Sequence, residues 1–205
     1  MNVTLSHPNI LELMYATAAK ARGRRALVRA TGITESTVRT ALRKLERAGY
    51  VTMDREGTHL TAAGRTRFAA LLDRVFHLGS LSCPNIALDS ANDGALVRRA
   101  AVELQSSIQF RDAAVRGGAS GAVLLGYSFD GWVFADSRVA LRSAYEEDVA
   151  ELNHACNTGG GPRPGDGVII AFGPTQRAAR SGLWQAIATL LERDAVQAED
   201  SSSAS

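Results

Sequence analysis

Residues 32–51 read GITESTVRTALRKLERAGYV, and this stretch decides how the N-terminal part of the chain folds. Its apolar side chains recur at the spacing of one face of an α-helix. They are Val38, Leu42 and Leu45. Thr34 stands where a helix N-cap hydroxyl is favoured, and Gly49 is typical of the residue that ends a helix. The stretch therefore predicts a helix over residues 35–48 with one face buried and the opposite face exposed.

The opposite face of this helix carries hydroxyl and guanidinium groups. Its residues are Ser36, Thr37, Arg39, Thr40 and Arg43. Such groups contact base edges and phosphates when a recognition helix lies in the major groove of DNA. A helix face that serves only solubility usually carries Glu and Lys, so this composition favours a DNA-binding role.

The segments around this helix predict a small domain. Two helical patterns precede it, in residues 8–20 and 26–30, and the second ends at Gly32. Residues 50–60 alternate between apolar and polar side chains around a Glu-Gly turn, which predicts a two-stranded hairpin. A further helix is expected over residues 61–75.

Three helices, a hairpin and a further helix, in this order, resemble the winged helix-turn-helix superfamily. The resemblance rests on the sequences of residues 32–51 and of residues 60–64, the latter of which read LTAAG. It implies that double-stranded DNA is the partner, that the hydroxyl-rich helix enters the major groove, and that Arg55 and His59 of the hairpin touch the DNA backbone or the minor groove. Winged helices also serve as protein-interaction modules, and that alternative stays open.

The distribution of charge agrees with a DNA-contacting N-terminal part. The chain as a whole has a net charge of +2, but residues 1–78 carry thirteen Lys and Arg against six Asp and Glu, a net charge of +7. The remainder carries a net charge of −5. A basic head and an acidic body suit a protein of which one part binds phosphate.

The C-terminal part has a mixed pattern of strands and helices. Strands are expected at residues 86–88, 95–97, 122–125, 132–134 and 167–172, and helices at 108–115, 139–156 and 175–193. We therefore predict an α+β chain in which the winged helix-turn-helix domain is followed by a small mixed α/β sandwich domain. Its expected parts are residues 1–78, a linker at 79–84, an effector-binding or dimerisation domain at 85–193, and a disordered tail at 194–205.

Three short segments of this part carry a further resemblance. Residues 107–114, 118–125 and 165–170 read SIQFRDAA, GASGAVLL and GDGVII. They are similar to a small archaeal family of winged-helix proteins whose C-terminal domain has no known function. The resemblance implies an architecture and no activity. Residues 159–164, GGGPRP, depart from the family pattern, and the three glycines predict a flexible hinge.

Polar residues near the expected strand ends form a candidate ligand pocket. They are Arg111, Asp112, Asp136, Arg138 and Asp166. The alternative is that Arg111 and Asp112 make structural ion pairs or helix caps, and this alternative is the more frequent one.

Several classes of function find no support in the sequence. No Ser, His and Asp set stands in a nucleophile motif, so we expect no enzyme, and no cofactor or metal site is expected because His154 and Cys156 lie on different helix faces. Cys83 and Cys156 are expected to be buried small hydrophobes. No apolar run is long enough to span a membrane, and the first residues lack a secretory pattern, which predicts a cytoplasmic protein.

These observations predict a sequence-specific DNA-binding transcriptional regulator. It is expected to act as a homodimer whose C-terminal domain dimerises, senses a small-molecule effector, or does both. The alternatives are a metabolic enzyme with a fused DNA-binding domain and a winged-helix protein-interaction adaptor.

Overall fold

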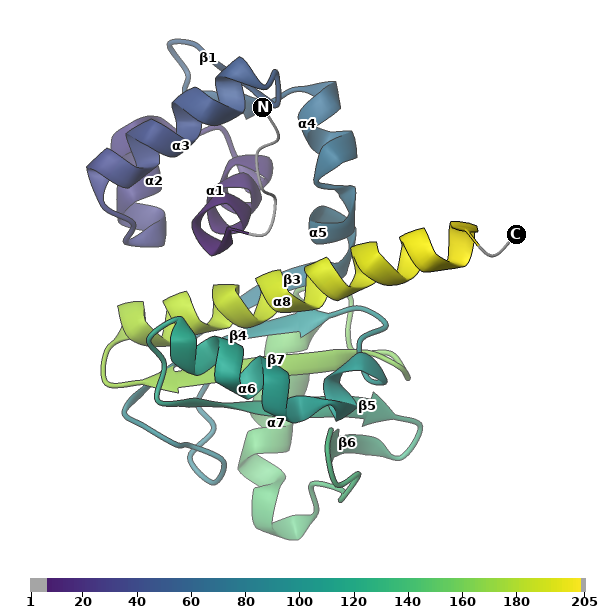
Figure 1. The fold of residues 1–205 in the computed structure, drawn as a ribbon. Coiled ribbons are helices and arrows are strands. Elements are labelled where there is room, and N and C mark those ends of the chain that lie inside the picture. Colours follow the sequence, from purple (N-terminus) through teal and green to yellow (C-terminus); the bar gives the residue numbers. More distant parts are fainter. Residues whose placement is uncertain (1–6, 204–205) are drawn as a thin grey trace. The chain divides into compact units, whose positions relative to one another are not determined.

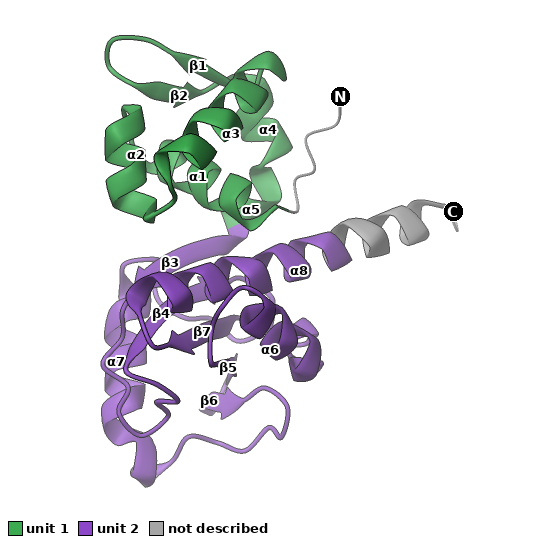
Figure 2. Cartoon of the chain, turned by 60° about the vertical axis from the view of Figure 1, so that its left-hand side comes forward, with its two compact units in different colours: residues 1–73 green, residues 74–205 purple. Residues whose placement is uncertain are grey.

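A computed structural model describes residues 7–203 of the chain, without the side chains of Ser143 and of residues 194–203. The chain forms two compact units, residues 1–73 and residues 74–205 (Figure 2). Within the described range, no helix combines the length and the apolar character that crossing a membrane requires.

Unit 1 begins with the helices that the sequence predicts, in the expected order. They are α1 (Pro8–Ala19), α2 (Arg24–Thr31) and α3 (Glu35–Arg47). Gly32 ends α2 in the left-handed conformation at φ +68°, where a residue without Cβ carries no steric cost. The three helices share one core, whose fully buried residues are Leu13, Met14, Leu27, Val38 and Leu45.

A two-stranded antiparallel hairpin follows α3, as expected. Its strands are β1 (Val51–Met53) and β2 (Thr58–Leu60), with Thr52 opposite His59. The hairpin is tied to the segment before α2, because the Thr58 backbone N–H donates to the Arg22 carbonyl oxygen at 3.0 Å. The turn passes so close to Arg22 that only glycine fits at Gly57.

The prediction of a single helix over residues 61–75 is wrong. The structure has two short helices, α4 (Ala62–Arg67) and α5 (Ala69–Arg74), separated at the buried Phe68, which packs edge-on against Tyr50. Val75 then starts a strand and pairs with Val97. This pairing to a distant segment overrides the local helical pattern.

Unit 2 is built on one five-stranded antiparallel sheet. Its strands are β3 (Val75–Gly79), β4 (Ala91–Val97), β5 (Gly121–Ser128), β6 (Gly131–Phe134) and β7 (Gly167–Gly173), in the spatial order β3-β4-β7-β5-β6. Its helices are α6 (Ser107–Arg116), α7 (Glu146–Asn157) and α8 (Gln176–Ser203), with short 3₁₀ turns η1 (Glu103–Gln105) and η2 (Ser143–Tyr145).

Helices cover both faces of this sheet (Figure 1). α6 and α8 pack together on one face, against β4, β5 and β7. On the other face, Leu152 and Cys156 of α7 join a buried cluster with alternate residues of β7, such as Ile170. Because both faces are covered, every residue of β7 is buried.

Several expectations for unit 2 are corrected. The segment expected as a linker packs into the core through Leu81 and Cys83, and the strand expected at residues 86–88 is a loop whose Ile86 is buried in the same cluster. The acidic helix begins at Glu146 instead of residue 139. The expected mixed α/β sandwich is present as one five-stranded sheet with helices packed on both faces. The closing helix expected to end at residue 193 continues to Ser203 and so covers most of the tail that was expected to be disordered, and residues 204–205 lie outside the described residues.

Both cysteines are free and buried, as the sequence predicts. Burial raises the pKa of the Cys83 thiol and that of the Cys156 thiol to about 12. Since the thiolate is the reactive form, both residues act as small apolar side chains at neutral pH.

The turn of the hairpin gives a test of the fold of unit 1. A Cβ added at Gly57 would lie 2.6 Å from the carbonyl carbon of Arg22, and its φ is +139°. Gly49 has φ +76° but open space around it. We expect Gly57→Ala to lose about 1–3 kcal/mol more in the free energy of unfolding than Gly49→Ala, measured by urea denaturation. Equal losses for the two variants would contradict this close approach.

Candidate nucleic-acid interface

The first turn of α3 holds three hydroxyl groups in a fixed arrangement. Thr34 caps the helix, because its Oγ1 accepts from the Thr37 backbone N–H at 3.4 Å. The same oxygen lies 3.2 Å from Ser36 Oγ and 2.9 Å from Thr37 Oγ1. This exposed cluster lies at the positive end of the helix dipole, which favours a negatively charged partner.

The residues expected to face a partner on α3 are exposed. Its apolar face is buried through Val38, Ala41, Leu42 and Leu45. The opposite face presents Ser36, Arg39, Thr40 and Arg43, and Thr37 is partly buried. Arg47, which is exposed and lies one turn beyond Arg43, continues this basic face. The structure therefore brings these five predicted residues together on one face.

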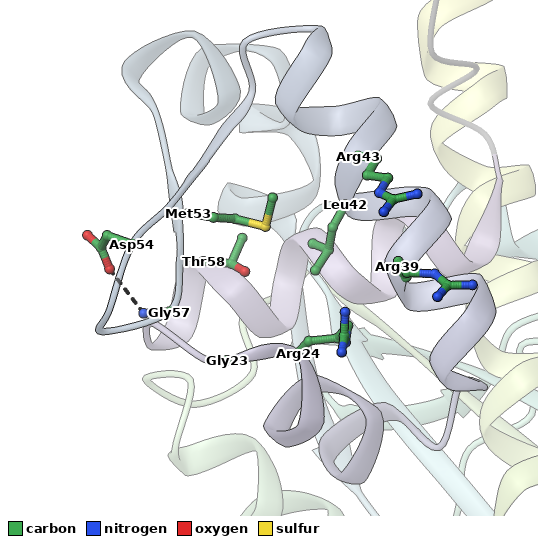
Figure 3. Close-up of a pocket in the computed structure, with 9 residues that line it drawn as sticks. All are labelled: Gly23, Arg24, Arg39, Leu42, Arg43, Met53, Asp54, Gly57 and Thr58. Carbon is green, nitrogen blue, oxygen red and sulfur yellow. Dashed lines mark hydrogen bonds between the residues drawn. The ribbon is translucent and has the colours of Figure 1, made fainter.

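A shallow pocket separates α3 from the hairpin (Figure 3). Its volume is about 180 Å³, and residues of α3, of the start of α2 and of the hairpin line it. Three of the lining residues are arginines, Arg24, Arg39 and Arg43. In Figure 3, Arg39 and Arg43 project from successive turns of α3, and Arg24 lies at the start of α2.

Arg24 was not among the residues predicted from the sequence. It lies in the basic run of residues 22–25, but nothing in that run shows that it approaches α3. In the structure Arg24 Nη2 lies 3.0 Å from Glu35 Oε1, and both side chains are about half exposed. An exposed pair of this kind contributes at most about 1 kcal/mol, so an approaching phosphate can compete for Arg24.

The turn of the hairpin is organised by Asp54. Its Oδ1 accepts from the backbone N–H groups of Glu56 at 2.8 Å and Gly57 at 3.1 Å. His59 Nε2 lies 3.0 Å from the same oxygen, so this predicted DNA-contacting side chain already has a partner within the hairpin. Arg55 is exposed at the turn.

The ligand pocket predicted in unit 2 is only partly assembled. Arg111 Nη2 lies 3.0 Å from Asp136 Oδ2, and Asp112 lines the same open pocket, whose volume is about 790 Å³. Arg138 and Asp166 do not line that pocket. Including these two residues in the predicted pocket was therefore wrong.

Asp166 has a structural role instead. It is buried, and its carboxylate accepts from Arg98 Nη1 at 2.6 Å and from the backbone N–H of Arg163 at 2.8 Å. Arg98 also donates to the carbonyl oxygens of Gly159 and Gly161. The expected glycine hinge is therefore anchored to β4 through this arginine. The buried carboxylate is satisfied in this way, because both of its oxygens accept hydrogen bonds, Oδ1 from the Arg99 backbone N–H at 3.0 Å and Oδ2 from Arg98 and Arg163.

Among the side chains that the structure describes, no group of three His, Cys, Asp or Glu is placed to hold a metal ion.

The hairpin allows a test of the Asp54 geometry. The hydrogen bond from His59, followed by the backbone N–H of Glu56, holds the pKa of Asp54 below its ordinary value. The stabilising contribution of this carboxylate is therefore present at neutral pH and is lost as the pH falls through the lowered pKa of the folded state. We expect His59→Ala to raise the pKa of Asp54 towards its ordinary value in a carboxyl-carbon NMR titration.

The matched control is Thr52→Ala, which changes the residue opposite His59 in the hairpin and should leave the pKa of Asp54 low. If Asp54 of the unmodified chain titrates at its ordinary value, the contact with His59 does not exist in solution.

Comparisons with known proteins identify relatives of the fold and supply no activity. No curated protein matches the sequence. A solved structure of a hypothetical protein from Pyrococcus horikoshii OT3 is similar to this chain, with 21% sequence identity, a TM-score of 0.66 and 95% of each chain covered. This likeness shows a shared mixed α and β fold over nearly the whole chain.

The sequence of unit 2 matches a family model described as a domain of unknown function, DUF4443. The match covers residues 88–190, which is half of the 205-residue chain and includes the sheet from β4 to β7. The chain therefore belongs to the DUF4443 family.

Proposed function

We propose that the chain is a sequence-specific regulator of transcription that binds double-stranded DNA through a winged helix-turn-helix in residues 7–73. One observation carries this proposal. The exposed face of α3 and the adjoining pocket gather Arg24, Arg39 and Arg43, next to the hydroxyl cluster of the first turn.

The geometry suggests a division of roles along α3. The major groove of DNA accommodates an α-helix, and arginine pairs with the acceptor edge of guanine in that groove. Arg39 lies one turn after the helix start and is assigned to base contacts, whereas Ser36 and Thr37 at the N-terminus are assigned to phosphate.

The hairpin acts as the wing in this proposal. Asp54 and Gly57 fix its turn, and the tie between Thr58 and Arg22 fixes its base. Arg55 projects from this fixed turn and is assigned to a phosphate of the DNA backbone. The His59 side chain keeps its contact with Asp54 and serves mainly to hold the turn.

The charge and surface of unit 1 favour DNA over a protein partner. Residues 1–78 carry a net charge of +7, which suits a polyanion. An adaptor surface would expose a large apolar patch. Among the described residues of unit 1, Met53 is the one large apolar side chain that is well exposed, with 43% exposure.

The remaining parts of the proposal concern assembly. A homodimer would place two copies of α3 in successive major grooves, roughly 34 Å apart. Unit 2 would then dimerise, sense a small-molecule effector, or do both. The division of the chain into the proposed DNA-binding unit and a separately folded sheet domain supports this role.

Substitutions of two arginines test the division of roles. We expect Arg39→Ala to weaken binding to a duplex selected by the unmodified protein by about 1–3 kcal/mol and to lower its preference over a scrambled duplex. We expect Arg55→Ala to weaken binding to both duplexes by similar factors. Fluorescence anisotropy on labelled duplexes measures both effects.

The charge-matched control is Arg142→Ala, which removes an exposed arginine of unit 2. It should bind both duplexes as the unmodified chain does. Unchanged binding by the Arg39 and Arg55 variants would contradict the proposed docking of α3.

A further inference from the structure

An open pocket lies beside α6 in unit 2, and the DNA binding proposed for unit 1 does not use it. Its volume of about 790 Å³ lies within the range of about 300–1,000 Å³ of small-molecule sites. η1 and the first turns of α6 form one wall, and Asp136 and Arg193 come from other elements. We propose that this pocket binds a small organic anion, with its carboxylate or phosphate group between Arg193, Arg111 and the N-terminal turn of α6.

Two guanidinium groups at the pocket have donors without acceptors. Arg111 uses Nη2 to contact Asp136, but its Nε is buried and has no hydrogen-bond partner. Arg193 Nη1 is also buried without a partner, although the guanidinium lies 6.0 Å from the centre of the Phe110 ring. A buried N–H group without an acceptor is costly, and an oxyanion supplies several acceptors at once.

The start of α6 adds further donors to the same wall. Ser107 is 5% exposed and lines the pocket, and its hydroxyl has no partner among the described residues. Ser106, the N-cap residue, makes no side-chain cap hydrogen bond, so the backbone N–H groups of the first turn are left uncapped. A bound anion would satisfy these groups and would benefit from the helix dipole.

The acidic residues of the pocket narrow the class of ligand. Asp136 is already paired with Arg111, so its charge is balanced within the protein. Asp112 is exposed at the rim and accepts hydrogen bonds only. The ligand therefore combines an anionic group with a hydroxyl or amino group that donates to Asp112, as hydroxy acids, amino acids and sugar phosphates do.

NMR titration of the full-length chain tests this site without knowledge of the natural ligand. Sodium phosphate and sodium acetate serve as probes of the anionic group, and sodium chloride at equal ionic strength controls for screening. We expect saturable shifts of the Ser107 and Ile108 amide signals and of the Arg111 and Arg193 side-chain signals with phosphate or acetate, and none with chloride. Stronger binding of phosphate indicates a phosphate ester, and stronger binding of acetate indicates a carboxylate.

Matched variants distinguish binding at this specific site from non-specific attraction of anions to the positive charges of the protein. Arg193→Gln should weaken the binding of the stronger probe by at least about tenfold, the loss expected for one charge-assisted hydrogen bond. Arg116→Gln, which removes an exposed arginine at the other end of α6, should leave it unchanged.

Ser107→Ala removes a hydroxyl without an intramolecular partner, so it tests the site even if Arg193→Gln fails to fold. It should weaken binding several-fold. Equal shifts with chloride, or an affinity of Ser107→Ala equal to that of the unmodified chain, would overturn the proposal. Neither result depends on DNA binding, so the site can fail or stand separately from the proposed function.

Discussion

Burial of the apolar face of α3 is the constraint on which unit 1 depends. Val38 and Leu45 are fully buried in the core shared with α1 and α2, so the opposite face must point outward. Loss of one such side chain costs about 2–5 kcal/mol, far more than any single surface contact supplies. The orientation of Arg39 and Arg43 is therefore set by the core and needs no contribution from a bound partner.

A second constraint organises unit 2. The buried pair of Arg98 and Asp166 joins the end of β4 to the loop before β7. Arg98 also donates hydrogen bonds to the carbonyl oxygens of Gly159 and Gly161. Because a buried charge without a partner is strongly destabilising, this loop has little freedom to move while the pair is intact. Neither Arg98 nor Asp166 lines the pocket beside α6, so the polar groups of that pocket take no part in this buried pair.

The sequence correctly predicts the elements that follow from a local pattern of residues. Its predictions are wrong where an element or a side-chain contact depends on a distant part of the chain. The helix of residues 35–47 follows from periodicity and from Thr34, whereas strand β3 exists only because it pairs with β4. The predicted face of α3 is exposed as expected, but Arg24 joins it through tertiary contact alone. The position of Asp166 before an expected strand predicts a place in a ligand pocket, but its actual partner, Arg98, lies 68 residues away in the sequence. In each failure, the deciding contact is far away along the chain.

Selection from a random duplex library at two salt concentrations is the sharpest test of whether α3 recognises a DNA sequence, as we propose. Phosphate contacts weaken steeply as salt rises, whereas base contacts keep a sequence preference. We expect enrichment of one sequence, arranged as an inverted repeat if the protein binds as a dimer. Weak, salt-sensitive binding with no enriched sequence at either concentration would contradict it.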